Sequence, residues 1–121
     1  MTDENYRELG LDIESARQRF LGNRGLFEKF LFRFPEDDNY KKILEAVSAG
    51  QTEEAFNAAH TLKGVCGNLS LTGLYEQVSK VTERLRAEEM PSVEELEELK
   101  EAYQKTLELL DSLKEKGIPE F

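Results

Sequence analysis

The sequence predicts an all-α fold, in which an antiparallel up-down four-helix bundle carries one or two additional N-terminal helices packed at one end. Apolar residues recur every three or four positions along most of the 121-residue chain, which is the spacing of a buried helix face. All three prolines fall between these periodic segments, and no sustained apolar–polar alternation indicates a strand. The last four segments are joined by short links, which favour antiparallel neighbours.

Two helices are predicted before the bundle, over residues 12–21 and 24–34. Their apolar and aromatic side chains are expected in the core: Ile13, Ala16, Phe20, Leu21, Phe27, Phe30 and Phe34. The Pro-Glu-Asp-Asp sequence at residues 35–38 ends the second helix and supplies acidic residues for the start of the next one. We expect both helices to pack across one end of the bundle.

The first two bundle helices are predicted over residues 38–49 and from Thr52 to about Gly67. Gly50 stands at the position favoured just after a helix end, and Thr52 is expected to cap the helix that follows. The earlier of the two helices is expected to bury four residues: Tyr40, Ile43, Leu44 and Val47.

The last two bundle helices are predicted over residues 71–87 and from Ser92 to about Lys116. Ser92 and Glu95 have the spacing of a capping box at the start of the final helix. The expected buried residues are Leu71, Leu74, Val78, Val81 and Leu85, then Leu96, Leu99, Tyr103, Thr106 or Leu107, Leu110 and Leu113. We therefore expect residues 1–121 to form a single domain, with the bundle over about 38–116 and the N-terminal helices over about 12–34.

The charge and composition exclude several classes of partner. The net charge is −9, with 25 acidic against 16 basic residues, and residues 88–121 alone carry 11 acidic and 4 basic ones. Phosphate backbones and anionic membrane surfaces attract the opposite sign, so we expect neither nucleic acid nor a membrane as a partner. One His and one Cys leave no His/Cys zinc site, and we expect no cofactor and no metal on this chain.

The cysteine count and the N-terminus indicate the compartment. Cys66 is the only cysteine, so no internal disulfide can form, which suits a reducing environment. The N-terminus lacks the basic and apolar regions of a signal peptide, and no stretch approaches the ~20 apolar residues that span a bilayer. We expect a cytoplasmic protein. The initial Met and a length filled by one domain favour a free-standing protein over a piece of a larger kinase.

One segment, residues 58–70, carries the candidate site. At about 100° per residue, Lys63, Gly64 and Gly67 fall within roughly 60° of His60 on a helix. The apolar residues of the same helix lie on the other side: Ala55, Ala59, Leu62 and Cys66. His60 is therefore expected to point away from the bundle core.

The two glycines on the His60 face need a reason, because a glycine inside a helix costs about 1 kcal/mol relative to alanine. Without a Cβ they let another protein approach the imidazole closely. The Lys63 ammonium attracts negative charge, and an exposed imidazole offers a neutral nucleophilic nitrogen at cell pH. These features together predict transient phosphorylation of His60. Phe56 is expected either at the hydrophobic edge of the docking surface or in the core, and residues 12–21 at the rim of the same surface.

The string His-Thr-Leu-Lys-Gly at residues 60–64, followed by Asn68 and Leu69, resembles the signature of histidine phosphotransfer (HPt) domains of multistep two-component phosphorelays. The resemblance covers roughly residues 10–116. Other residues that fit the layout of the family are Gly10, Leu11, Asp12, Phe20, Gly50, Gln51, Thr52, Leu71 and Leu74. The resemblance implies a four-helix bundle with a phosphoacceptor His on its second helix, in a phosphoprotein of bacterial signalling.

The resemblance also implies a role for each motif residue. His60 is the phosphoacceptor, Lys63 neutralises the phosphoryl oxygens, and Gly64 leaves room for the phosphoryl group and the receiver. The structural motif residues are Leu62, Asn68 and Leu69, and the candidate supporting residues are Gly67, Asn57, Phe56 and Thr82. Thr82 stands where many members have a Gln that hydrogen-bonds the imidazole or phosphate, and its shorter hydroxyl would reach that far only through water.

The implied partners are response-regulator receiver domains, which supply the aspartyl phosphate and its Mg²⁺, and a hybrid sensor histidine kinase. We expect a monomeric phosphoryl carrier without ATP-dependent kinase activity, since the sequence has no GxxxxGK[ST] loop.

Two alternatives stay open at this stage. One is a non-catalytic helical adaptor, or a degenerate HPt domain that binds receivers without carrying phosphate, and the missing Gln at Thr82 supports it. The other is a hydrolase that uses His60 with Cys66. Six residues along a helix put these two side chains about 120° apart, which argues against the hydrolase.

Overall fold

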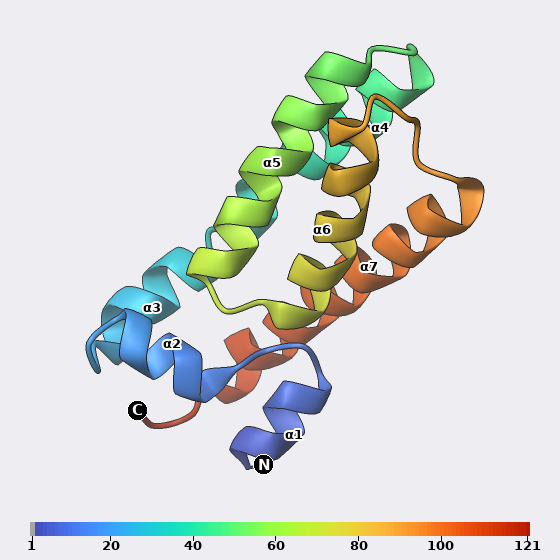
Figure 1. Ribbon diagram of the computed structural model, residues 1–121. Coiled ribbons are helices and arrows are strands. Elements are labelled where there is room, and N and C mark those ends of the chain that lie inside the picture. Colours follow the sequence, from blue (N-terminus) through green and yellow to red (C-terminus); the bar gives the residue numbers. More distant parts are fainter. Residues whose placement is uncertain (1) are drawn as a thin grey trace.

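The computed structural model describes residues 2–121, which form helices and turns without a strand (Figure 1). The helices are α1 (Asp3–Glu8), α2 (Ile13–Arg19), α3 (Arg24–Leu31), the single 3₁₀ turn η1 (Phe34–Glu36), α4 (Asn39–Ser48), α5 (Thr52–Asn68), α6 (Thr72–Arg86) and α7 (Val93–Lys116). The prediction of an all-α protein is confirmed. The short helix α1 lies before the first predicted helix and was missed, because six residues are too few for a periodic apolar pattern.

The four long helices pack on one another in chain order. Helix α4 packs on α5, α5 on α6, and α6 on α7. Figure 1 shows α5 and α6 side by side and running in opposite directions around the turn that joins them. On the remaining side, the ring of Tyr40 in α4 stacks on that of Tyr103 in α7, with centroids 4.0 Å apart and 14° between the planes. Helix α5 therefore lies between two neighbours, α4 and α6.

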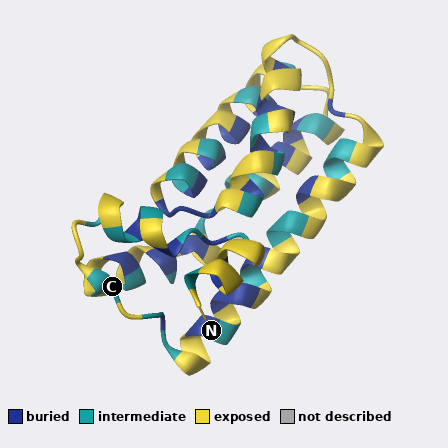
Figure 2. Cartoon of the chain, turned by 60° about the horizontal axis from the view of Figure 1, so that its bottom comes forward, coloured by how far each residue is buried: buried dark blue, intermediate teal, exposed yellow. Residues whose placement is uncertain are grey.

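Buried residues follow the predicted stripes on the inner faces of these helices (Figure 2). The predicted stripe of α6 is buried throughout: Leu74, Val78, Val81 and Leu85, with Leu71 just before the helix. On α5, Ala55, Ala59, Leu62 and Cys66 are all fully buried. On α7, Thr106 is buried and Leu107 is half-buried, so Thr106 is the core member of that pair.

Three residues predicted in the core are exposed instead. Leu21 is 93% exposed, because α2 ends at Arg19 and Leu21 has a φ of +51°, which turns the chain out of the helix. Phe30 is 42% exposed, and its ring lies beside that of Phe20, with centroids 6.3 Å apart. Leu44 is 38% exposed, since the buried residues of α4 are Ile43 and Ala46 and Leu44 falls beside that narrow stripe.

The N-terminal helices cover the end of the structure where α5 turns into α6 (Figure 1). The backbone N–H of Asp12 donates to the carbonyl of Ser70 at 3.0 Å, and that of Gly73 donates to the carbonyl of Gly10 at 3.2 Å. A Cβ on Gly10 or Gly73 would lie 3.2–3.3 Å from the Cα of the other, so this contact requires small residues in both segments. These bonds fix α2 against the end of α5.

The C-terminal residues after α7 hold the same N-terminal helices from the other side. The Arg24 guanidinium donates to the carbonyls of Ile118 at 2.6 Å and Pro119 at 3.1 Å. The ring of Phe121 packs on Phe27, with centroids 5.4 Å apart, and the guanidinium of Arg17 lies 5.7 Å from the centre of the Phe121 ring. The N-terminal helices are thus attached to both the α5–α6 turn and the end of α7.

The helix ends follow local sequence rules with small shifts. The capping box of Ser92 and Glu95 is present, as predicted. Gly50 follows α4 with a φ of +71°, the left-handed conformation expected after a helix end. Thr52 is the first residue of α5, whereas the capping position belongs to Gln51, whose side chain makes no capping hydrogen bond.

A testable consequence concerns Glu88, which follows the end of α6 with a φ of +60°. Left-handed backbone costs a non-glycine residue about 1–2 kcal/mol, and a glycine avoids this cost. The gain is partly offset because glycine loses roughly 0.5–1 kcal/mol more conformational entropy on folding. We expect Glu88→Gly to raise the free energy of unfolding by about 0.5–1 kcal/mol in urea denaturation. The control Glu89→Gly removes the same charge at a residue without positive φ and should not stabilise the protein. Equal effects of the two substitutions would contradict the strain argument.

Candidate functional site

Helix α5 presents two different faces, and the candidate site lies on the exposed one. The helix begins with Glu53 and Glu54 in its first turn, where carboxylates favour the helix dipole. Its inner face is buried against α4 and α6. His60 is exposed on the outer face, as the helical spacing predicted.

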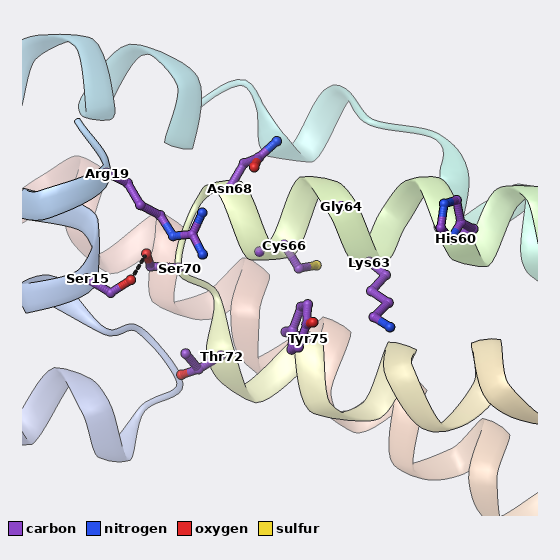
Figure 3. Close-up of a pocket in the computed structure, with 11 residues that line it drawn as sticks. Ser15, Arg19, His60, Lys63, Gly64, Cys66, Asn68, Ser70, Thr72 and Tyr75 are labelled. Carbon is purple, nitrogen blue, oxygen red and sulfur yellow. Dashed lines mark hydrogen bonds between the residues drawn. The ribbon is translucent and has the colours of Figure 1, made fainter.

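His60 lies at one end of an open groove between α5, α6 and the end of α2 (Figure 3). The groove brings together parts of the chain that are far apart in sequence: α2, the outer face of α5, the turn after it and the first turns of α6. Its lining residues are Ser15, Arg19, His60, Lys63, Gly64, Cys66, Gly67, Asn68, Ser70, Thr72 and Tyr75. The lining contains two cationic side chains and no carboxylate.

Lys63 lies one turn after His60 and extends toward α6 (Figure 3). Its Nζ is 5.8 Å from the centre of the Tyr75 ring, within the range of a cation–π contact. None of the ion pairs among residues 2–121 involves Lys63. The ring holds the side chain in the groove and leaves its charge available to an incoming anion.

The two glycines of the His60 face have different surroundings. A Cβ built on Gly64 would meet no atom within 4 Å, so the surface beside His60 is open there. A Cβ on Gly67 would lie 3.4 Å from a ring carbon of Tyr75. Gly64 therefore provides clearance on the outer face, whereas Gly67 lies under the Tyr75 ring where α6 approaches α5. The expectation that both glycines clear the approach to His60 holds only for Gly64.

Phe56 is half-buried and stacks directly on the imidazole. The ring centroids of Phe56 and His60 are 5.7 Å apart, with 18° between the planes. The Arg86 guanidinium, from the end of α6, lies 5.1 Å from the centre of the Phe56 ring. Phe56 thus belongs to the margin of the core and to the surroundings of His60 at once.

Two candidate supporting residues lie elsewhere. Thr82 is fully buried, and its hydroxyl donates to the carbonyl of Val78 at 2.7 Å, so it faces the core and not the imidazole. Asn57 is exposed and lines a second groove, between α4 and α5, about 60° around α5 from His60 on the flank opposite Lys63. The expectation that Thr82 supports the imidazole is therefore wrong, because the packing of α6 turns its hydroxyl into the core.

The turn after α5 closes through its backbone. The N–H of Leu71 donates to the carbonyl of Cys66 at 2.9 Å and that of Ser70 to Gly67 at 3.2 Å, the pattern of a Schellman motif. Ser70 takes the left-handed position of this motif with a φ of +57°, and its hydroxyl donates to that of Ser15 at 3.0 Å.

The motif residues around this turn divide into buried and exposed ones. Leu62 and Leu69 are buried, as expected of structural residues. Asn68 is exposed, and among the described residues its side chain makes no hydrogen bond. Asn68 points away from the turn in Figure 3, so its side chain does not have the structural part that was expected of this motif residue.

Sequence reasoning missed the contributions of Tyr75 and Arg86, and it indicated Arg19 only through the expectation that residues 12–21 rim the surface. Tyr75 and Arg86 lie on α6 and reach α5 only because the two helices are antiparallel. Arg19 enters the groove from α2 (Figure 3), and none of the ion pairs among residues 2–121 involves it. No local motif marks these three residues.

Cys66 is not placed to act with His60. The side chain is fully buried, and burial, with a smaller contribution from the charge of Asp37, raises the pKa of its thiol to about 12. The thiolate is the nucleophilic form of cysteine, so Cys66 is unreactive at neutral pH. The hydrolase alternative that pairs Cys66 with His60 is contradicted by this burial.

Within residues 2–121, no group of three or more His, Cys, Asp and Glu side chains is arranged to hold a metal ion. In the same part of the chain, no helix combines the length and the apolar character that crossing a membrane requires.

Comparison with protein families identifies the class. A family model described as "Hpt domain" matches residues 26–114, about three quarters of the chain, and the chain belongs to this family. No curated protein and no solved structure matches the chain. Hpt domains perform histidine phosphotransfer in phosphorelays and interact with response-regulator receivers of two-component systems. The family resemblance seen in the sequence is confirmed.

We expect Gly64→Ala to raise the free energy of unfolding by about 1 kcal/mol, because alanine favours a helix interior and its Cβ meets open space. Urea denaturation followed by circular dichroism measures this. Gly67→Ala is the matched comparison and should gain less, since its Cβ contacts the Tyr75 ring. A loss of stability in Gly64→Ala would show that Gly64 serves the fold, and would remove the argument that it is a clearance for a partner.

Proposed function

We propose that this protein is a phosphorelay intermediate that accepts a phosphoryl group on His60 from a receiver-domain aspartyl phosphate and passes it to the Asp of another receiver. One observation carries the proposal: the only histidine of the chain is exposed on the outer face of α5, where an unpaired ammonium and an open glycine flank it. The family match supports the same reaction in its general form.

The reaction needs a nucleophile and little else from this chain. The unprotonated ring nitrogen of His60 attacks phosphorus in line with the acyl phosphate bond of the receiver. The N–P bond forms, the P–O bond to the aspartyl oxygen breaks, and the carboxylate leaves with the electron pair. The same steps in reverse, on a second receiver, return the imidazole. The transition state is loose and spreads its negative charge over the phosphoryl oxygens.

The electrostatics of the groove favour that charge. Lys63 is the nearest groove cation to His60 along α5, one helical turn away, and the groove lining holds no carboxylate among the described residues. At an effective dielectric of about 20, two unit charges 4 Å apart interact by roughly 4 kcal/mol, and salt reduces this at a surface. Lys63 therefore stabilises the bound phosphoryl group and the transition state, while the open side at Gly64 admits the receiver.

Other components come from the partners. The Mg²⁺ that assists the transfer stays on the receiver, and the chain itself uses neither ATP nor a cofactor. A hybrid sensor histidine kinase charges the first receiver, and the protein works as a cytoplasmic monomer. In this arrangement α4–α7 form an antiparallel up-down four-helix bundle, and the contacts of α5 with α4 and α6 support it.

The first test mixes the full chain with receiver domains charged by acetyl phosphate and follows the phosphoryl adduct. The wild type should take up one acid-labile, base-stable phosphoryl group, as an N–P bond requires. His60→Gln should abolish this adduct while the far-UV circular dichroism stays unchanged, because the side chain is exposed. An adduct that survives the substitution would refute the assignment.

The same experiment separates the adaptor alternative. A chain that binds receivers but takes up no phosphoryl group from any of a panel of charged receivers would be a degenerate domain. The buried Thr82, which leaves the imidazole without the usual Gln, would then be the structural explanation.

The second test concerns Lys63. We expect Lys63→Ala to slow phosphoryl transfer by about tenfold, because the cation lies beside the reacting group, and each factor of ten corresponds to about 1.4 kcal/mol. Lys80→Ala is the charge-matched control, since Lys80 lies on α6 and pairs with Glu98 of α7 at 3.8 Å. Rapid-quench transfer assays at low salt measure both variants. Equal effects would mean that only the net charge of the protein matters.

A further inference from the structure

The imidazole of His60 is held by an aromatic contact instead of a hydrogen bond. Among the described residues, no side chain or backbone group hydrogen-bonds the ring. Its neighbour is the ring of Phe56, with centroids 5.7 Å apart and planes only 18° from parallel. Phe56 lies one turn earlier on α5, and helical side chains lean toward the preceding turn. The His60 ring therefore leans over the Phe56 ring.

The Phe56 ring is itself fixed by α6. It is half-buried at the margin of the core, and the Arg86 guanidinium lies 5.1 Å from its centre. Arg86 is in turn paired with Glu83, at 3.3 Å between Nε and the carboxylate oxygen. A chain of contacts thus leads from α6 to the reactive ring: carboxylate, guanidinium, phenyl, imidazole.

Stacking and hydrogen bonding leave different parts of the His60 ring free. A hydrogen bond to the ring would occupy one of its two nitrogens, whereas stacking contacts the ring face and leaves both nitrogens at the free edge. An exposed side chain without such a contact samples several rotamers, and only some of them direct a nitrogen at an incoming phosphorus.

We propose that Phe56, supported by Arg86, is the positioning residue that holds the His60 imidazole in its reactive orientation. This inference rests on the proposed phosphotransfer function and adds a residue to it. Thr82 does not take this part, because its hydroxyl is buried and bonded to the carbonyl of Val78. Phe56 touches neither the phosphoryl group nor the receiver in this scheme and acts through His60 alone.

The chain offers a matched control for the pair. Arg17 of α2 and the C-terminal residue Phe121 form a similar cation–ring contact at 5.7 Å, and no histidine takes part in it. The test compares Phe56→Leu and Arg86→Gln with Phe121→Leu and Arg17→Gln, and adds Phe56→Tyr as the variant that keeps an aromatic ring.

Two measurements are made on each variant of the full chain. Proton NMR follows the ring protons of His60, which the Phe56 ring current shifts upfield when the rings are stacked. Rapid-quench assays with an acetyl-phosphate-charged receiver give the limiting transfer rate at saturating receiver and the receiver concentration for half that rate.

We expect Phe56→Leu to abolish the ring-current shift and to lower the limiting rate by about threefold to tenfold, with the half-saturating concentration unchanged. Arg86→Gln should lower the limiting rate by about twofold to threefold, Phe56→Tyr should restore wild-type behaviour, and the two control variants should leave both readouts at wild-type values.

Three results would overturn the inference. An unchanged limiting rate in Phe56→Leu means that stacking has no part in transfer. A rise in the half-saturating concentration alone means that Phe56 is a docking contact and not a positioning residue. An equal loss in Phe121→Leu means that the effect comes from stability. The first two leave the phosphotransfer function intact, whereas a wild type that takes up no phosphoryl group refutes both proposals.

Discussion

The burial of one face of α5 between α4 and α6 is the constraint on which the rest of the structure depends. Ala55, Ala59, Leu62 and Cys66 are all fully buried, so the rotation of α5 about its axis is fixed. With about 100° between successive residues, that rotation leaves His60 no position except the solvent face. The small side chains Ala55 and Ala59 let the neighbouring helices approach closely, and the N-terminal helices close the end of the groove that begins at His60.

The groove differs in charge from the rest of this strongly acidic protein. The chain has a net charge of −9, and its acidic excess is concentrated in the part that contains α7. The groove lining, in contrast, contains Lys63 and Arg19 and no carboxylate. Under the proposed function, a phosphoryl group would meet a locally cationic surface, while the negative charge of the remaining surface disfavours contact with acidic partners elsewhere. Lys63 lies one helical turn from His60, whereas Arg19 lies at the far end of the groove (Figure 3).

Local rules account for most of what the sequence predicted. Periodicity assigned the long helices and their buried stripes, and the capping box at Ser92 and the glycine after α4 marked two helix ends correctly. The same rules failed where an element was too short for a period, as in α1, or where a chain reversal exposed an apolar residue, as at Leu21. The prediction that Leu44 is buried failed for a related reason. The width of the buried stripe on a helix depends on the neighbouring helix, which the sequence pattern does not place.

For the site, the sequence by itself determined which residues share a face of α5: His60, Lys63 and Gly64 lie together because their spacing matches the helix period. Only the tertiary structure decided what surrounds that face. It placed Tyr75 against Gly67 and Lys63, brought Arg86 onto Phe56, and turned Thr82 into the core. These contacts join residues on separate helices, and their geometry depends on the register and tilt with which α6 packs on α5. A helix period contains no information on either quantity.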